Sequence, residues 1–189
     1  HVTGNLRLAT NQERMDEYRK YCGTANTIGV PFEMIGPEEV AKLWPLANIE
    51  GIVGALYHPH DGHIAPADLT NALALGARNR GAEIYRQTPV TGATQKPNGE
   101  WIIHTPKGDI TCEHVVCATG NYARQTGALF GLEVPAIPVE HQYIVTEPHP
   151  ALIERQQQGL PEMPVLRESD ASYYMREERQ GLILGPYEK

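Results

Sequence analysis

The chain has 189 residues and a formal net charge of −7, because 16 Lys and Arg stand against 23 Asp and Glu. That length suits one moderate domain with a real hydrophobic core. The acidic balance argues against a nucleic-acid-binding protein, which needs a basic surface to meet phosphates. No apolar run approaches the roughly 20 residues of a membrane span. Three cysteines are too few for a disulfide scaffold, and their odd number is typical of a reducing compartment.

The two ends of the chain suggest a piece of a longer protein. The sequence begins at His1 without a Met or a signal-peptide n-region, and it stops shortly after the apolar run 182–184. We therefore expect further sequence on both sides.

The first block, residues 1–60, combines short strands with two helices. Alternation of apolar and polar residues predicts a strand over 5–9. Asn11 is a candidate cap for a helix over 12–23, and Pro37 with the acids after it opens a second helix that ends before Pro45. The remaining extended segments are expected at 32–35 and 52–57.

The second block, residues 61–131, opens with a helix that starts at Pro66 and closes near Gly81. Short strands follow, with turn signals at 97–99 and 107–109. The expected strands are 83–85, 90–95, 101–105, 110–111 and 114–118, and a short helix is expected at 122–129.

The third block, residues 132–189, begins with strict alternation over 139–146, which predicts a strand with His141, Tyr143 and Val145 on one face. Residues 147–164 are proline-rich and predict a long surface excursion that includes one helical turn. Segments 172–176 and 181–184 are expected to form a hairpin.

These elements together predict an α/β fold with α+β character. The apolar segment 114–118 runs into Ala118-Thr119-Gly120 and then into a helix, which is where α/β proteins often hold phosphates. The signal is weak by itself, because the chain has no G-x-G-x-x-G and no P-loop.

Two groups of residues, one of potential metal ligands and one of thiols, are interpreted as structural. His58, His60 and His63 with Asp61 are ligand types, but their spacing matches no zinc pattern, so the sequence predicts a turn and no metal. Cys112 and Cys117 form no C-x-x-C and are interpreted as buried structural thiols.

The best polar and aromatic set combines His141 and Tyr143 with Tyr173 and Tyr174. A histidine and a tyrosine in contact can handle a proton near neutral pH. The alternative is ordinary packing, since strands favour tyrosine and bury its ring. The residues alone leave both open.

The whole chain resembles the dimethylglycine and sarcosine dehydrogenases, which are FAD-dependent amine oxidoreductases with a D-amino-acid-oxidase-like fold. The motifs that carry the resemblance run in the same order from one end to the other. They are Gly4–Thr10, Gly54–Tyr57, Asp61–Ile64, Ala74–Arg78, Pro89–Thr91, Ala118–Gly120, Val139–Tyr143, Pro164–Arg167, Ser172–Arg176 and Gly185–Glu188.

The resemblance implies the central fragment of such an enzyme. Residues 1–60 and 132–189 would belong to a substrate domain with a mixed or antiparallel sheet, and residues 61–131 to part of the FAD-binding domain. The dinucleotide-binding motif and a flavin-linking histidine would precede the chain, and a last FAD-contacting segment would follow it. The implied compartment is the bacterial cytoplasm or the mitochondrial matrix.

Site residues follow from the same resemblance, position by position. His141 and Tyr173 match the active-site histidine and tyrosine, and Tyr187 and Arg176, or Arg167, are candidates for contact with the substrate. Val90 matches an adenine contact and Tyr122 replaces a usual tryptophan. The turn near the FAD diphosphate matches Ala118, Thr119 and Gly120.

The implied reaction is hydride transfer from an N-methyl carbon of dimethylglycine or sarcosine to FAD. The amine must be neutral, because its lone pair stabilises the iminium product. Implied partners are the small N-methyl amine, an electron-transfer flavoprotein and tetrahydrofolate. The alternative is a non-catalytic binding or interaction domain that has lost the dinucleotide-binding unit.

Overall fold

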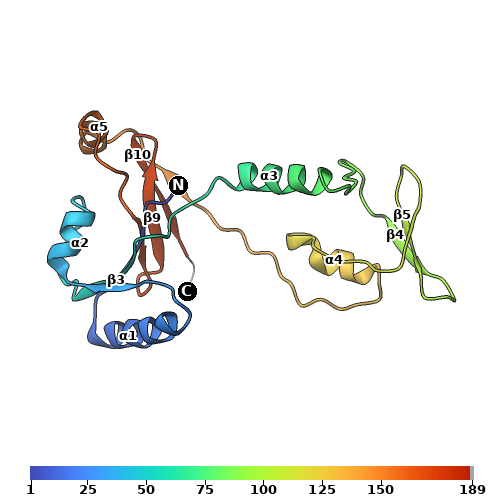
Figure 1. Cartoon of the computed structure of the whole chain (residues 1–189), viewed down its shortest axis with the longest axis horizontal. Coiled ribbons are helices and arrows are strands. Elements are labelled where there is room, and N and C mark those ends of the chain that lie inside the picture. Colours follow the sequence, from blue (N-terminus) through green and yellow to red (C-terminus); the bar gives the residue numbers. More distant parts are fainter. Residues whose placement is uncertain (188–189) are drawn as a thin grey trace. The chain divides into compact units, whose positions relative to one another are not determined.

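The computed structural model describes residues 1–187, which form two compact units (Figure 1). Unit 1 combines residues 1–66 with the chain from His141 onward, and unit 2 comprises residues 67–140. Unit 1 is therefore assembled from two segments that are far apart in the sequence.

Unit 1 is built on a seven-stranded mixed sheet with the order β2-β3-β1-β8-β9-β10-β7. The central pair, β1 and β8, is parallel, with Asn5 opposite Val165, and the neighbouring strands pair antiparallel. The mixed sheet confirms the predicted fold class. Its strands are β1 (Asn5–Ala9), β2 (Glu33–Ile35), β3 (Gly54–His58), β7 (Ile144–Val145), β8 (Val165–Glu168), β9 (Tyr173–Glu178) and β10 (Gly181–Pro186).

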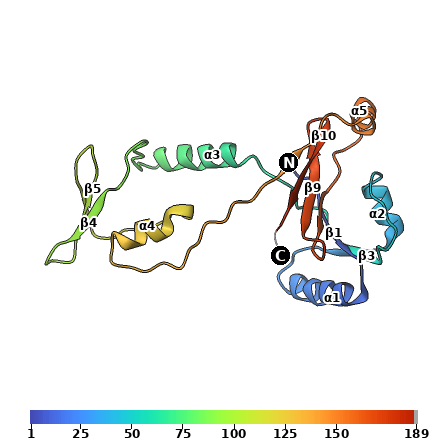
Figure 2. The same cartoon turned by 180° about the vertical axis from the view of Figure 1, so that it is seen from behind.

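Helices cover both faces of this sheet (Figure 2). Helix α1 (Gln12–Thr27) packs Met15 and Tyr18 against Ala9 and Leu56 on one face. Helices α2 (Pro37–Leu43) and α5 (Pro150–Gln157) contribute to the larger core on the other face. That core contains Leu6, Leu8, Val40, Trp44, Ala55, Leu152, Met163 and Leu166. Within residues 1–187, no helix combines the length and apolar character needed to cross a membrane.

Local signals explain where these helices begin. The Asn11 side chain accepts a hydrogen bond of 2.8 Å from the backbone N–H of Arg14, which satisfies one of the free donors of the first turn. Pro37 occupies the first turn of α2, where its missing N–H costs nothing. Both predicted helix starts are confirmed, and α1 extends to Thr27, beyond its predicted end at residue 23.

An ionic contact ties α1 to the turn between β8 and β9. The Arg14 guanidinium pairs with Asp170, which also accepts hydrogen bonds from Thr10 and Asn11. The hydrogen bond from Arg14 lowers the pKa of the Asp170 carboxyl. This contact fixes α1 on the sheet from a point outside the core.

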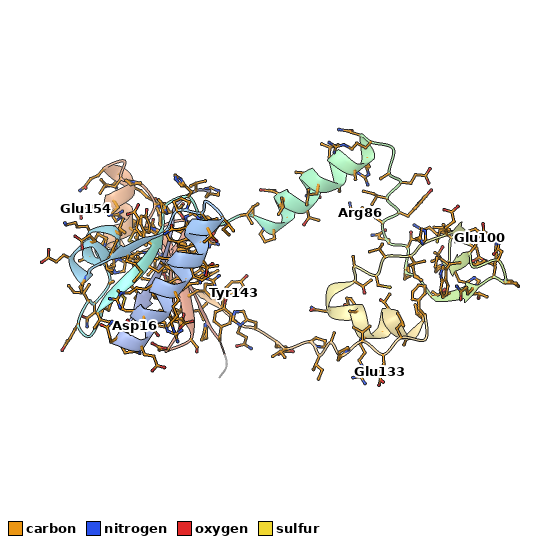
Figure 3. All side chains as sticks on the ribbon, turned by 60° about the horizontal axis from the view of Figure 1, so that its bottom comes forward. Asp16, Arg86, Glu100, Glu133, Tyr143 and Glu154 are labelled. Carbon is orange, nitrogen blue, oxygen red and sulfur yellow. The ribbon has the colours of Figure 1, made fainter. Side chains whose placement is uncertain are left out.

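Unit 2 has one long helix and a small antiparallel sheet. The described helix α3 (Pro66–Arg78) has no buried residue. The sheet consists of β4 (Gly92–Gln95), β5 (Trp101–His104) and β6 (Ile110–Cys112), and a 3-10 turn, η1 (Gly120–Tyr122), leads into α4 (Ala123–Ala128). Figure 3 shows side chains clustered densely in unit 1 and spread along the segments of unit 2.

Several predicted strands are wrong in extent. Segments 83–85 and 114–118 are not strands, and the strand predicted over 139–146 is confined to β7. The excursion 147–164 contains the two-turn helix α5. A strand exists only where another strand supplies hydrogen bonds, and apolar character cannot show this. The interpretation of Cys112 and Cys117 as buried thiols is also wrong, because Cys112 is half-buried and Cys117 is exposed.

Candidate functional site

The predicted site residues fall into two sets, one in each unit. Unit 1 contains His141, Tyr173, Arg176 and Tyr187, and unit 2 contains Val90, Ala118, Thr119, Gly120 and Tyr122. Each set is described within its own unit.

Three aromatic rings meet at one face of the unit 1 sheet. The rings of His141 and Tyr187 stack with centroids 4.8 Å apart and an interplanar angle of 20°. The Tyr174 ring lies 5.5 Å from Tyr187 and 5.9 Å from His141. We refer to His141, Tyr174 and Tyr187 as the aromatic triad.

The predicted Tyr173 lies on the opposite face from the triad. Side chains alternate along a strand, so Tyr173 and Tyr174 of β9 point to opposite faces. Tyr173 packs against the larger core, and burial there raises the pKa of its hydroxyl. A partly buried tyrosine that holds its proton more tightly is suited to packing, whereas Tyr174 occupies the position beside His141.

Strand β10 makes room for the Tyr174 ring. Gly185 is directly opposite Tyr174 in the β9–β10 ladder. A Cβ at Gly185 would lie 2.2 Å from atoms of the Tyr174 ring, closer than any real contact. Glycine at this position therefore lets the ring lie against the backbone of β10. The backbone N–H of Tyr187 donates to the Ser172 carbonyl at 2.6 Å, which holds the end of β10 beside the start of β9.

Helix α1 covers one part of the sheet face on which the triad lies. This helix contacts β1, β2 and β3. Helices α2 and α5 contribute to the core of the other face. His141 is exposed and Tyr187 is 44% exposed, so the triad is accessible to a ligand within this unit.

The two candidate arginines differ in their surroundings. The guanidinium of Arg176 is bound to the Glu178 carboxylate at 2.7 Å and to the Glu177 carbonyl at 2.7 Å. Arg167 is exposed and lies directly opposite Tyr174 in the β8–β9 ladder. Register thus brings Arg167 to the triad's face, and Arg176 is already engaged with acidic neighbours.

The second set of predicted residues is exposed in unit 2. Val90 and Tyr122 have exposed fractions of 42% and 70%. The turn at Thr119 is closed by a hydrogen bond of 3.0 Å from the Tyr122 N–H to the Thr119 carbonyl. Apart from Gly120 and its two neighbours in the chain, no described residue comes within 4 Å of the position that a Cβ of Gly120 would occupy, so the backbone at this turn is open to close approach.

The sequence analysis names all three residues of the triad, but it predicts the active-site role for His141 and Tyr173 and includes Tyr174 only in the wider polar and aromatic set. The resemblance pointed to the first tyrosine of the pair 173–174, and the face of each depends on the ladder register. Gly185, which lies within one of the family motifs, indicates space for an aromatic ring beside it. Only the pairing of β10 with β9 shows that this ring belongs to Tyr174.

Comparison with known proteins supports the resemblance along the whole chain. The family model described as FAD dependent oxidoreductase matches residues 1–189. The chain is 43% identical over 188 residues to the mitochondrial dimethylglycine dehydrogenase of Rattus norvegicus, and 34% identical over 190 residues to the mitochondrial sarcosine dehydrogenase of Homo sapiens. These alignments cover 100% and 98% of this chain but only 22% and 20% of the relatives. The chain therefore spans about a fifth of the length of these curated relatives.

The fold has a counterpart among solved structures. The L-proline dehydrogenase from P. horikoshii matches with a TM-score of 0.81 and 29% sequence identity, over 98% of this chain and 48% of that one. Both the family match and this structural match run through unit 1 and unit 2. By sequence and by fold, the chain belongs to the family of FAD dependent oxidoreductases.

Proposed function

We propose that the chain is the central part of a longer FAD-dependent dehydrogenase that oxidatively demethylates an N-methylated glycine such as dimethylglycine or sarcosine. The observation that carries the proposal is the aromatic triad on the open sheet face of unit 1. The relatives named dimethylglycine dehydrogenase and sarcosine dehydrogenase support this substrate class.

The triad suits a methylated amine because its rings offer apolar contact and negative π faces. Methylammonium groups bind against aromatic rings through cation–π attraction and contact with their methyl groups. His141 can then take the ammonium proton, since histidine exchanges protons near neutral pH. Loss of that proton leaves the nitrogen lone pair that an iminium product requires.

A carboxylate on the substrate needs a cationic partner. Arg167 fits this role better than Arg176, because its strand position is opposite Tyr174 and its side chain is exposed. An arginine presents paired N–H donors that match the two oxygens of a carboxylate. We assign Arg167 to the glycine carboxylate and Tyr174 to the amine side.

The residues of unit 2 fit a role in holding FAD. The open backbone at Thr119 and Gly120 allows close approach of a diphosphate, and Val90 offers an exposed apolar contact for the adenine. Tyr122 offers an exposed ring in place of the usual tryptophan. When bound, FAD supplies the hydride acceptor, which no side chain can provide. The chain lacks a G-x-G-x-x-G motif, so the proposed cofactor site draws on residues of the longer protein as well.

The proposed partners follow from the same chemistry. An electron-transfer flavoprotein would accept the two electrons removed from the amine, and the one-carbon unit of the iminium product would pass to tetrahydrofolate or, after hydrolysis by water, leave as formaldehyde. These assignments rest on the family resemblance and on the proposed reaction.

The test is flavin reduction in the longer protein that contains this chain, followed by stopped-flow absorbance. Dimethylglycine and sarcosine are expected to reduce the flavin, and trimethylglycine is expected to leave it oxidised because its quaternary nitrogen has no lone pair. Glycine and L-proline serve as comparison substrates. Reduction by either of these but by neither N-methylglycine would contradict the proposed substrate class.

The neighbouring tyrosines of β9 provide a matched pair of variants. Tyr174→Phe is expected to slow flavin reduction by dimethylglycine at least about tenfold, because its hydroxyl lies on the triad's face. Tyr173→Phe removes the same atom on the opposite face and is expected to leave the rate constant within about twofold of wild type. The readout is the limiting rate constant of flavin reduction. The opposite pattern would return the role to Tyr173.

A second candidate function is a non-catalytic regulatory or binding domain. A mitochondrial relative from Mus musculus, named pyruvate dehydrogenase phosphatase regulatory subunit, is 32% identical over 99% of this chain. A longer protein that binds no flavin, or binds flavin that no amine reduces, would favour this second function.

A further inference from the structure

We propose that His1, His63 and Glu162 form a Zn²⁺ site on unit 1. One candidate ligand atom from each residue lies within 4.8 Å of the other two. The three residues lie outside the aromatic triad and take no part in the proposed amine chemistry. Sequence spacing favoured no metal at the histidine cluster, and the structure brings in one acidic ligand from 99 positions away.

Backbone contacts hold the two histidines side by side. Val2 and Gly62 form an antiparallel bridge, and the His63 N–H donates to the His1 carbonyl at 3.1 Å. A Cβ at Gly62 would lie 2.0 Å from that carbonyl oxygen, so only glycine permits this approach. The His1 and His63 rings stack 4.8 Å apart with an interplanar angle of 8°.

Glu162 reaches the same place through the central strands. The Val165 N–H donates to the Gly4 carbonyl at 3.0 Å, which begins the β1–β8 pairing. The Met163 N–H donates at 2.7 Å to the buried carboxylate of Glu177. These bonds fix the backbone immediately after Glu162, so its carboxylate meets His63 without free movement of the loop.

The present distances are close to those of a zinc site. In a tetrahedral site with bonds of 2.0–2.1 Å the ligand atoms are about 3.3 Å apart. The Nε2 atom of His63 and Oε1 of Glu162 are 2.7 Å apart, so this pair must open slightly. The widest pair must close from no more than 4.8 Å, and the His1 side chain is exposed at the surface.

The donor set selects the metal. Two imidazoles with one carboxylate are a recurrent ligand set of zinc, and they leave a fourth position for water or a small anion. That position has room, because the three residues line an open cavity of about 630 Å³. The His63 and Glu162 side chains are 18% and 29% exposed, so they are shielded but reachable.

The cationic side chains of the cavity are largely engaged elsewhere. Arg176 is bound to Glu178, and Arg155 donates to the Pro161 carbonyl at 2.9 Å. The other charged residues that line the cavity are Glu177, Glu178 and Arg179. A bound zinc ion would join the segment before β1, the chain after β3 and the loop before β8, and so would stabilise unit 1.

The test is equilibrium dialysis of the metal-free protein against Zn²⁺, with metal content measured by elemental analysis. Wild type is expected to bind one zinc per chain and to melt at a higher temperature with zinc than without it. His63→Ala and Glu162→Gln are each expected to weaken binding at least about tenfold, since even loss of an outer partner costs that much. Cobalt provides an independent reading, because a tetrahedral Co²⁺ site absorbs visible light strongly.

His60→Ala is the matched control, because it removes a nearby histidine that is not in the proposed ligand set. It is expected to bind zinc as wild type does. Circular dichroism of each metal-free variant checks that unit 1 remains folded. Failure of the folded wild-type protein to bind zinc would overturn the proposal, as would binding that survives both His63→Ala and Glu162→Gln. Flavin reduction by amines is measured separately, so failure here leaves the proposed dehydrogenase function intact.

Discussion

Replacing His141 by alanine is expected to slow flavin reduction by dimethylglycine about 10²–10⁴-fold, the usual contribution of a positioned acid–base group. The imidazole stacks on Tyr187 and lies beside Tyr174, so its loss removes the proton acceptor and one wall of the triad. Flavin content should be unchanged, because the residues proposed to hold FAD lie in unit 2. The measurement is stopped-flow absorbance of the longer protein at saturating substrate.

Tyr143→Phe is the control for this experiment. Tyr143 lies two positions along the same segment, just before edge strand β7, and is 58% exposed (Figure 3). In the Tyr143→Phe variant, dimethylglycine should reduce the flavin at the wild-type rate. If the rate constant of flavin reduction were the same in the His141→Ala and Tyr143→Phe variants, His141 would have no part in the chemistry.

The second large effect is expected in the core of unit 1. Trp44→Ala should lower the free energy of unfolding by about 3–5 kcal/mol, the usual cost of emptying a buried tryptophan site. Trp44 is 2% exposed, and its indole N–H donates to the Pro164 carbonyl at 2.6 Å. The side chain thus joins the end of α2 to the entrance of β8. Urea unfolding followed by circular dichroism measures the change.

Two further variants are needed to interpret the loss of stability in Trp44→Ala. Trp44→Phe retains much of the apolar contact but leaves the Pro164 carbonyl without its donor, at a cost of about 1–3 kcal/mol. Ile28→Ala, at a position 73% exposed, should change stability by no more than about 0.5 kcal/mol. If Trp44→Ala were as mild as Ile28→Ala, this core would not be the main source of stability in unit 1.

Elements with local signals could be predicted from the sequence. Helices α1, α2 and α3 begin where Asn11, Pro37 and Pro66 indicate, because caps and prolines act within one turn. The β9–β10 hairpin was also predicted, since its strands are neighbours in the chain. Such features need no knowledge of distant residues.

Elements that depend on distant partners could not be predicted in the same way. Strand β8 was missed because its four residues show no alternation, and its partner β1 lies at the other end of the chain. Segment 114–118 has the composition of a strand, yet no other described segment pairs with it. Whether a segment becomes a strand depends on the edge available to it.

The residues of the candidate site also differ in whether they could be predicted from the sequence. His141 and Tyr187 were identified by resemblance, whereas the face of Tyr174 follows from the position of Gly185 across the ladder. The proposed zinc ligands show most clearly what the sequence alone cannot predict. His63 stood in a recognised cluster, but Glu162 joins it only through the β1–β8 pairing.

The parallel pairing of β1 with β8 also imposes an order on biosynthesis. Strand β1 is synthesised before β8, so Leu6 and Leu8 cannot be covered by Leu166 until all the residues between these strands have been made. Contacts between residues so far apart in sequence close slowly. All of unit 2 is synthesised in the interval, while the edge of β1 remains open to pairing with other chains. Nascent chains of this protein should therefore depend on chaperones until β8 has emerged.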